Sequence, residues 1–399
     1  MENFAHITAI LTTVLAIAAM GYCLTVLIAV ASFRRYAAQP LPDFTVDTAP
    51  GITILKPVKG FDPGMYEAFR SHCTQLYNGP YELIFGAGNE DDPAIPAVHQ
   101  LMAEFPQIPM QLVLCPERLG TNGKVSNLIQ ILPRARHSFI LINDSDIHVS
   151  PRYLARVMAQ FFAASPKPIG MVTALYRGHA SRNASGKRTF GGILEALGIA
   201  TDFQAGVLVA RLVESGIHFG LGSTLAVRQE ALAAAGGLEA LVDQLADDYE
   251  MGARIDKAGY TVRLATEVVE TSIPAYNWHG FVSHQLRWTR TVRDSRQWGY
   301  VGLLFTHLLP LALVNILASG ASIASLWFFG LAFFLRLGTA MQVGSGVLGD
   351  RQVLEYLWLL PIRDCIGFAL WFWGFAGNTI EWRGERFLLK SGRLVKTEN

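Results

Sequence analysis

The sequence has few cysteines. There are four, Cys23, Cys73, Cys115 and Cys365, and no two of them form a Cys-x-x-Cys pair. Disulfide-stabilised domains and structural zinc sites depend on cysteines at characteristic spacings. The sequence therefore argues against both kinds of stabilisation.

Charged residues are also scarce. They make up 16% of the chain, whereas soluble proteins usually contain about a quarter. The formal net charge is +1, so the overall charge gives no indication of nucleic-acid binding. The chain has no visible internal repeat, and its 399 residues are enough for two domains.

One long stretch near the N-terminus has no charge at all. It runs from Ile7 to Ala31, 25 residues, which is enough to cross a bilayer core of about 30 Å. No small-residue cleavage site follows, so we predict a membrane anchor and not a signal peptide. Arg34 and Arg35 come directly after it, and the positive-inside rule places the chain beyond Ala31 in the cytoplasm.

Three more apolar segments follow residue 300. If each crosses the membrane, the C-terminus lies outside, whereas the basic residues of the tail favour the inside; one re-entrant or half-inserted segment would resolve this conflict. Charges inside such segments usually pair or face protein. Adjacent residues do not face each other on a helix, so we expect Arg363 and Asp364 at the interface or with partners elsewhere. The segments are Val301–Ser319, Ala321–Met341, which contains Arg336, and Tyr356–Ile380.

Strands alternate with helices between the anchor and these segments. β-branched and apolar runs predict the strands, and Gly206–Val227 fits a buried helix and strand of the same domain. Such alternation predicts a Rossmann-like, mostly parallel sheet, whose ligands bind beyond the carboxyl ends of the strands. The predicted strands are Ile52–Leu55, Tyr81–Gly86, Met110–Leu114 and Phe139–Ile142, and the predicted helices are Met65–Leu76, Ala94–Phe105 and Val125–Leu132.

Two carboxylates follow the fourth predicted strand. Asp144 and Asp146 can point into one site if the strand ends in a turn, and Mg²⁺ or Mn²⁺ is commonly held by one or two carboxylates plus substrate phosphates. The alternative is a polar turn in which Asp146 caps the next helix. Their position after a buried strand favours ligand binding.

Two other polar groups also precede predicted helices. Asp91 and Asp92 stand before Pro93, where an N-cap is the simple explanation and nucleotide contact is the functional one. Lys124 lies at a helix N-terminus, which suits a phosphate or a uracil carbonyl, although a single lysine is more commonly a surface residue.

A third acidic pair opens the helical stretch from Tyr249 to Ala258. Asp247 and Asp248 could simply stabilise the helix N-terminus. Alternatively, Asp248 is a general base that takes the proton from an acceptor hydroxyl within hydrogen-bond reach.

A basic helix with tryptophans precedes the segments after residue 300. It contains the sequence Gln285-Leu286-Arg287-Trp288, and an arginine recurs at every third position from Arg287 to Arg296. This composition predicts a helix at the membrane interface. Arg287 can clamp a diphosphate with two hydrogen bonds, and we expect at least two of the four arginines to bind lipid headgroups.

Taken in order, these motifs resemble a known family. Asp-Asp-Pro-Ala, Lys-Val-Ser-Asn, Asp-Ser-Asp, Ala-Asp-Asp-Tyr and the Gln285 to Trp288 segment, taken as Gln-x-x-Arg-Trp, are similar to those of the ceramide glucosyltransferase family, glycosyltransferase family 21. The segments Ile54–Gly60 and Trp382–Phe387 are also similar. Each motif alone is weak, and their combination is specific.

The resemblance implies a GT-A catalytic domain, a UDP-sugar donor, a divalent metal and inversion at the anomeric carbon. It implies that Asp248 is the catalytic base and that Asp144 and Asp146 bind the metal. It also implies donor contacts by Pro57, Asp92, Lys124, Asp144, Gln285, Arg287 and Trp288.

Two departures leave the acceptor open. Asp146 and Ser126 differ from the animal ceramide enzymes and look more like bacterial glycosyltransferases of hopanoid biosynthesis. The expected acceptor is thus ceramide with glucose, or a hopanoid with N-acetylglucosamine, at a bacterial inner membrane. The rival classes are a transporter, which the large α/β region disfavours, and a non-catalytic lipid-binding protein.

The predicted organisation has six parts. These are an N-terminal transmembrane anchor (1–33), a linker (34–49), a cytoplasmic GT-A domain (50–280), an interfacial helix (281–300), transmembrane or re-entrant helices (301–380) and a basic tail (381–399).

Overall fold

The computed structural model describes residues 2–382, 385–390 and 392–396. The described chain forms two compact units, each built from separate stretches of sequence. Unit 1 contains residues up to Ala38, Arg182–Ser215 and Ala275–Ser391, and unit 2 contains Gln39–Ser181, Gly216–Pro274 and the residues from Gly392 onward. The predicted catalytic range 50–280 is therefore interrupted, because residues 182–215 pack with the helices near the two ends of the chain.

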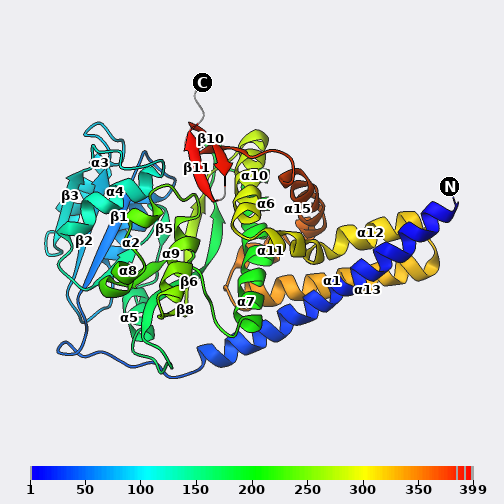
Figure 1. Cartoon of the computed structure of the whole chain (residues 1–399), viewed down its shortest axis with the longest axis horizontal. Coiled ribbons are helices and arrows are strands. Elements are labelled where there is room, and N and C mark those ends of the chain that lie inside the picture. The colour runs from blue at the N-terminus through cyan, green and yellow to red at the C-terminus, as the bar shows by residue number, and fades with distance from the viewer. Residues whose placement is uncertain (1, 383–384, 391, 397–399) are drawn as a thin grey trace. The chain divides into compact units, whose positions relative to one another are not determined.

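Unit 2 is built on an eight-stranded mixed sheet in the order β3-β2-β1-β4-β7-β6-β8-β5 (Figure 1). Strands β1, β2, β3 and β4 pair in parallel, as do β6 and β8, whereas β7 and β5 run antiparallel to their neighbours. The strands are β1 (Ile52–Val58), β2 (Tyr81–Ala87), β3 (Met110–Leu114), β4 (Phe139–Ile142), β5 (Ile147–His148), β6 (Ile169–Ala180), β7 (Leu225–Arg228) and β8 (Thr261–Ile273).

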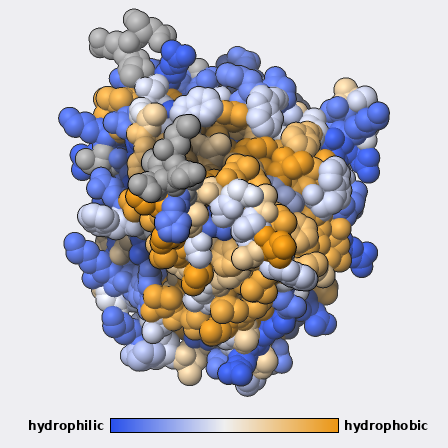
Figure 2. All heavy atoms as spheres, turned by 90° about the vertical axis from the view of Figure 1, so that its right-hand side faces the viewer, coloured by the Kyte–Doolittle hydropathy of each residue, from blue (hydrophilic) through white to orange (hydrophobic). Residues whose placement is uncertain are grey.

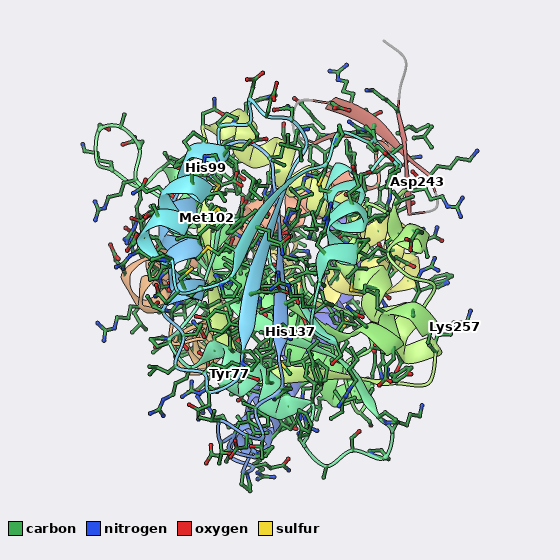
Figure 3. The ribbon with its side chains drawn as sticks, turned by 90° about the vertical axis from the view of Figure 1, so that its left-hand side faces the viewer. Tyr77, His99, Met102, His137, Asp243 and Lys257 are labelled. Carbon is green, nitrogen blue, oxygen red and sulfur yellow. The ribbon has the colours of Figure 1, made fainter. Side chains whose placement is uncertain are left out.

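Helices flank this sheet. Figure 3 shows α3, which carries His99 and Met102, beside the strands, and it shows Tyr77 and His137 near one end of the strands. At that end the Tyr77 hydroxyl donates to the carbonyl of Pro50, just before β1. The helices of unit 2 are α2 (Met65–Cys73), α3 (Ile95–Glu104), α4 (Gly123–Ile131), α5 (Tyr153–Gln160), α8 (Gln229–Ala234) and α9 (Asp247–Lys257), and strand β11 (Arg393–Lys396) also belongs to it.

Two predicted elements differ from the structure by three residues at one end. Strand β1 continues past Leu55 to Val58, because Pro57, which has no backbone N–H to donate, lies where β1 pairs with β2 and no longer with β4. Helix α2 stops at Cys73, not at Leu76, since the amide of Leu76 donates to the carbonyl of Pro151 at 2.6 Å.

Unit 1 consists mainly of helices. The 36-residue α1 packs against α7, α12 and α13. The helices are α1 (Glu2–Ala37), α6 (Phe190–Gly198), the π-helical turn η2 (Ile199–Phe203), α7 (Gln204–Val213), α10 (Trp278–Ser295), α11 (Gln297–Gly302), α12 (Leu308–Ala318), α13 (Ile323–Ala340), the π-helical turn η5 (Met341–Ser345), α14 (Arg351–Glu355) and α15 (Leu360–Gly374). Short 3₁₀ turns connect some of them, and β9 (Thr379–Trp382) pairs with β10 (Glu385–Lys390) in an antiparallel hairpin.

Three stretches of unit 1 are long and apolar enough to cross a membrane: His6–Ala37, Phe190–Val213 and Ile323–Ser345. A fourth candidate is the pair Gln297–Thr306 and Leu308–Ala318, bent by 61°. The predicted segment from Tyr356 to Ile380 is not among these candidates, since its helix α15 has only 15 residues. By contrast, Phe190–Val213 was not predicted to be one.

Large apolar side chains cover the outside of these helices. Ile7 and Ile28 of α1 are 64% and 59% exposed, and Trp327 and Phe334 of α13 are 78% and 71% exposed. Figure 2 shows such side chains gathered on one face of the protein. Exposed apolar surface of this extent marks a membrane or partner contact.

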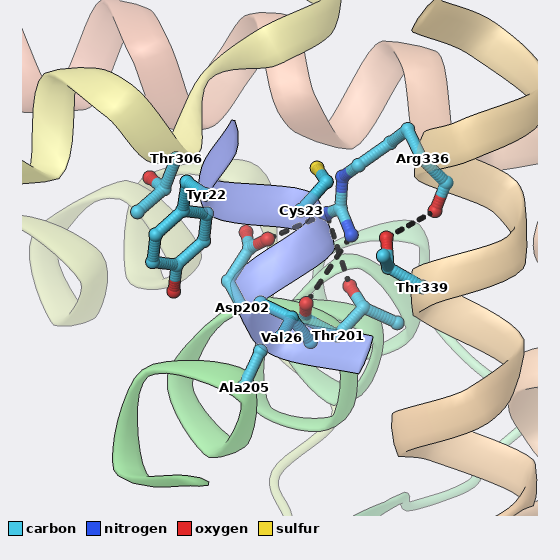
Figure 4. A pocket seen from close by; sticks show the side chains of 9 residues that line it. All are labelled: Tyr22, Cys23, Val26, Thr201, Asp202, Ala205, Thr306, Arg336 and Thr339. Atoms are coloured by element: carbon cyan, nitrogen blue, oxygen red, sulfur yellow. Dashed lines mark hydrogen bonds and ion pairs between the residues drawn. The ribbon is translucent and has the colours of Figure 1, made fainter. Parts of the chain in front are cut away.

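Charged residues inside unit 1 have partners from distant parts of the sequence. Arg336 of α13 donates to Asp364 of α15 through Nε and Nη2, both at 2.9 Å, and to Asp202 of η2 (Figure 4). Arg363 pairs with the other oxygen of Asp202 at 2.9 Å. Of the two alternatives that the sequence left open, Arg363 and Asp364 therefore follow the second: each pairs with a residue elsewhere in the chain, and they do not pair with each other.

Candidate active site

A lysine joins two acidic motifs of unit 2 that lie far apart in the sequence. The Nζ of Lys124 is 2.8 Å from Oδ1 of Asp144 and 3.3 Å from Oδ2 of Asp247. Lys124 stands in the first turn of α4, whose N-cap Asn122 accepts a bond from Val125 N and donates to Asp247. The Asp144 side chain is 43% exposed and that of Lys124 is 18% exposed. The ion pair therefore borders solvent and can meet a ligand.

Asp248 faces the same place from α9. A Cβ on Gly222 would lie 3.1 Å from Oδ2 of Asp248 and 3.5 Å from Oδ2 of Asp144. Gly222 thus leaves open the space that these two carboxylates border, and any side chain there would fill it. The loop holding Gly222 is fixed by Thr173, which bonds both the amide and the carbonyl of Leu221.

A close backbone contact sets the position of α9. A Cβ on Gly252 would come within 2.3 Å of the amide nitrogen of Gly220. Only a glycine allows the helix to approach the loop this closely. Asp248, one turn earlier on α9, is positioned by this contact.

Asp146 lies on the other side of Ser145. Its Oδ2 accepts a hydrogen bond from the Thr271 hydroxyl at 2.5 Å. Burial, and then the negative charge of Asp144, raise the pKa of Asp146 to about 6. Ser145 itself donates to Asp62 at 2.6 Å, so the turn after β4 is held on both sides.

Burial also shifts the pKa of the neighbouring groups. It raises the pKa of Asp248 to about 6, and the charge of Asp247 adds to this effect. For Lys124, burial opposes the charge, but the carboxylates of Asp144 and Asp247 outweigh it and hold its pKa above the ordinary value. The site is thus a cluster of coupled charges in which the lysine remains a cation.

Sequence reasoning missed Lys56. Its side chain is fully buried, its Nζ donates to the carbonyl of Asp144 at 3.3 Å, and burial lowers its pKa to about 7 against the pull of Asp144 and Asp146. The available signal was a lysine directly after the apolar run Ile52–Leu55. It was overlooked because the strand was expected to end at Leu55.

A buried network supports the strand end before Asp144. The Oδ1 of Asn143 accepts from Nε2 of His72 at 3.1 Å, and its Nδ2 donates to the hydroxyl of Tyr153 at 2.9 Å and to the carbonyl of Ser223 at 2.7 Å. The hydroxyl of Tyr153 also bonds that of Thr224 at 2.8 Å. These bonds connect β4 with the loop of Gly222.

Asp92 and Pro57 are less exposed to solvent than Asp144. Both oxygens of Asp92 accept from Gly60 N, at 3.0 and 3.2 Å, and Oδ1 also accepts from Ala94 N. The residue is 6% exposed. Asp92 therefore ties the loop after β1 to the start of α3, while Pro57 is half-buried within β1.

Gln285, Arg287 and Trp288 lie on α10, in unit 1. The amide of Gln285 donates to Oε2 of the buried Glu195 at 3.3 Å, and Nδ1 of His284 lies 3.0 Å from the same oxygen. The Trp288 ring packs against Phe203 and His284, with centroids 5.6 and 5.5 Å apart. One residue, not two, separates Gln285 from Arg287, so the interpretation of Gln285 as the first residue of Gln-x-x-Arg-Trp is wrong; that spacing falls on His284.

The other arginines of this helix bind protein groups. Arg290 donates to the carbonyls of Thr379 and Ala376, and Arg293 donates to Gly374 O, Gly377 O and Asn378 Oδ1. Arg296 pairs with Glu214 at 2.8 Å. The expectation that at least two of the four arginines bind lipid headgroups is therefore corrected: carbonyls at and after the end of α15 attract the guanidinium groups of Arg290 and Arg293, and Glu214 attracts that of Arg296.

A divalent cation such as Mg²⁺ prefers oxygen ligands, and the acidic cluster of unit 2 offers carboxylates. In the part of the chain that the structure describes, no three His, Cys, Asp or Glu side chains converge on one cation position. Asp144 and Asp146 are nonetheless close enough for one charge to raise the pKa of the other. Mg²⁺ is often bound by one or two carboxylates, with water and substrate phosphates completing the shell, so this pair fits such an ion.

The model of "Glycosyl transferase family 21" matches residues 11–395. The chain belongs to glycosyltransferase family 21. This confirms the resemblance seen in the motifs, and it makes the protein a sugar-transferring enzyme.

Relatives of this family 21 enzyme are ceramide glucosyltransferases. It is 23% identical over 360 residues to ceramide glucosyltransferase 3 of Caenorhabditis elegans, covering 87% of this chain and 74% of the relative. It is 24% identical over 367 residues to ceramide glucosyltransferase 1 of the same organism, covering 88% and 74%.

A solved structure shares the fold. The mannosyltransferase PcManGT of Pyrobaculum calidifontis, in complex with GDP-Man and Mn²⁺, matches with a TM-score of 0.52 and 18% identity, covering 92% of this chain and 99% of that one. The predicted GT-A fold class, with helices that could span a membrane, is confirmed.

Proposed function

We propose that this family 21 enzyme transfers a sugar from a UDP-sugar to a hydroxyl of a membrane lipid, with inversion at the anomeric carbon. The observation that carries the proposal is the placement of the Asp248 and Asp144 carboxylates around the open position at Gly222. The relatives' name supports glucose as the sugar and ceramide as the acceptor. The alternative is N-acetylglucosamine on a hopanoid, which the Asp144-Ser145-Asp146 sequence favours.

Asp248 is the base of this reaction. The acceptor oxygen forms a bond to the anomeric carbon while the bond from that carbon to the UDP oxygen breaks, and the acceptor proton moves to Asp248. Its pKa of about 6 leaves most of the carboxylate ionised at neutral pH while making it a better proton acceptor than an ordinary aspartate.

The donor is held by several groups in this proposal. Lys124 and Asp144 border the open position and contact the nucleotide, while Pro57 and Asp92 shape the loop after β1. Asp144 and Asp146 would hold a divalent cation. When bound, such an ion supplies positive charge that stabilises the leaving diphosphate.

The prediction that residues of α10 also contact the donor is part of this proposal. Arg287 offers a planar guanidinium suited to a diphosphate, and Gln285 and Trp288 lie beside it on the same helix. The candidate spans of unit 1 support a membrane acceptor and an integral membrane location. We place the catalytic residues on the cytoplasmic side of a bacterial inner membrane, from Arg34 and Arg35 after the first span.

Purified full-length protein tests the proposal. It is incubated with radiolabelled UDP-glucose or UDP-N-acetylglucosamine and with ceramide or a hopanoid polyol in mixed micelles, and labelled lipid is quantified. Labelled ceramide supports the first assignment and labelled hopanoid the second. Absence of labelled lipid in all four combinations would refute the lipid acceptor.

Asp248→Asn separates an enzyme from a non-catalytic lipid-binding protein. We expect the variant to bind UDP with native affinity and to lose transfer by about 10²–10⁴-fold, the usual contribution of a general base. The matched control is Asp256→Asn, on the same helix. A variant retaining more than half of the native rate would remove Asp248 from the mechanism.

A further inference from the structure

One face of α6 and η2 carries the acidic side chains of an otherwise apolar stretch. Between Phe190 and Ala200 the only charged residue is Glu195, and Asp202 follows seven positions later. Spacings of three and four place Glu195, Gly198 and Asp202 along one side of the helix. Isolated acids in apolar helices are costly and need partners.

Arginines hold Asp202, at the C-terminal end of this face. Asp202 pairs with both Arg336 and Arg363. Gly198 allows the Arg363 guanidinium to lie against the helix, because a Cβ there would come within 2.4 Å of Nη2. These contacts immobilise the helix against α13 and α15.

Glu195, at the N-terminal end of this face, contacts His284 and Gln285 on α10. The side chain of Glu195 is 4% exposed, and its Oε2 binds both His284 and Gln285, at 3.0 and 3.3 Å. His284 in turn packs between Tyr276, at 5.4 Å, and Trp288, at 5.5 Å. One carboxylate oxygen therefore determines the orientation of two neighbouring polar side chains, next to Arg287 and Trp288.

We propose that Glu195 is a positioning residue for sugar transfer, which fixes His284 and Gln285 so that α10 presents a preorganised surface to the donor. This inference rests on the proposed role of α10 in donor binding. Preorganisation matters because protein side chains that must be reoriented when the UDP-sugar binds reduce its affinity. Glu195 itself does not need to touch the substrate.

Three substitutions test this role in purified full-length protein. Glu195→Met keeps the volume and removes the acceptor, and we expect KM for the UDP-sugar to rise by about tenfold, the cost of an unpaired buried group. Glu195→Gln keeps one acceptor and should recover most of the affinity. The control Glu214→Gln changes the partner of Arg296, at the other end of α10, and should leave KM unchanged.

Double variants show whether Glu195 acts through the motif. In a His284→Ala or a Gln285→Ala background, adding Glu195→Met should raise KM for the UDP-sugar little further, since the effects of substitutions at interacting residues are not additive. KM for the lipid acceptor should stay unchanged in all variants. If Glu195→Met does not fold, Glu195→Gln is compared in the same two backgrounds, where its smaller effect should disappear.

Several results would overturn the inference. They are a native KM for the UDP-sugar in Glu195→Met, equal losses in Glu195→Met and Glu195→Gln, or additivity with both alanine variants. Failure of the proposed function is a separate result, because the wild-type protein would then transfer no sugar to any lipid.

Discussion

Asp248 combines burial with a negative neighbour, and both oppose its ionisation. Its pKa of about 6 lies above the ordinary value of 3.8, although Lys124 acts in the other direction. A carboxylate of this kind serves as a base only when it is ionised. If Asp248 is the proposed base, its environment connects the rate of transfer to pH.

We predict that kcat/KM for the UDP-sugar falls as pH decreases through about 6. The fall is not caused by unfolding: a carboxyl whose pKa is higher in the folded than in the unfolded state stabilises the fold further as pH drops between these two pKa values. A pH–rate profile measures the change, with circular dichroism confirming the fold at each pH. A rate that stays constant down to pH 5 would contradict the prediction.

The second residue-scale prediction concerns Asp146. If Asp144 and Asp146 hold a divalent ion, excess EDTA should abolish transfer, and Mg²⁺ or Mn²⁺ should restore it. Asp146→Asn should raise the metal concentration needed for half-maximal activity by at least roughly 10- to 100-fold, the loss that removing a partner of a metal ligand already causes. Full activity in EDTA would show that Lys124 and Arg287 stabilise the leaving group alone.

At this scale the acidic residues of the candidate site were easier to predict from the sequence than the buried residues that contact the site residues. Asp144 and Asp248 stood out because they follow a strand end and open a helix. Lys56 and Glu195 did not, since each is a single polar residue whose partner, Asp144 or His284, is about 90 residues away. Such pairings depend on tertiary packing, which local patterns do not contain.

At the scale of elements, the end of α15 is held by arginines of α10. Arg293 donates to two carbonyls and to Asn378, in the geometry that a planar guanidinium permits. Lysine can replace the charge but not the fork of donors.

We therefore expect Arg293→Lys to destabilise the detergent-solubilised protein. Hydrogen bonds to charged groups contribute about 1.5–3 kcal/mol each, and losing one should lower the thermal unfolding midpoint by several degrees. Arg296→Lys on the same helix is the control, because its more exposed ion pair with Glu214 contributes only about 0–1 kcal/mol. Equal midpoints for the two variants would rule out this role.

Elements themselves were partly predictable. The strands of unit 2 were recognisable from β-branched and apolar runs, and β3 and β4 have the predicted bounds. The stretch Phe190–Val213 was not recognised, because Glu195, Asp202 and Arg211 interrupt its apolar pattern. Its assignment to unit 1 follows from partners on α1, α10 and α13, which are distant in the sequence.

At the scale of the molecule, the orientation in the membrane is testable. Lys257 of α9 is exposed (Figure 3). In a Cys365→Ser background, which removes the one exposed native cysteine of the described chain, Lys257→Cys should react with a membrane-impermeant maleimide only after cells are permeabilised.

The control for this labelling is His6→Cys, at the other end of the first candidate span. It should react in intact cells, because the positive-inside rule predicts from Arg34 and Arg35 that the far end of α1 is inside. Labelling of Lys257→Cys in intact cells would reverse the proposed orientation.

The division of the chain between the units has a consequence for biosynthesis. The segment before Asp247 is held by residues that come last in unit 2: Leu394 N donates to Asp243 O at 2.9 Å, and Leu245 N donates to Gly392 O at 3.1 Å. All the helices of unit 1 are translated before these partners emerge from the ribosome. The start of α9, with its proposed base, therefore acquires its last backbone contacts only after every candidate membrane span has been made, so that premature termination within the helices leaves the base without this support.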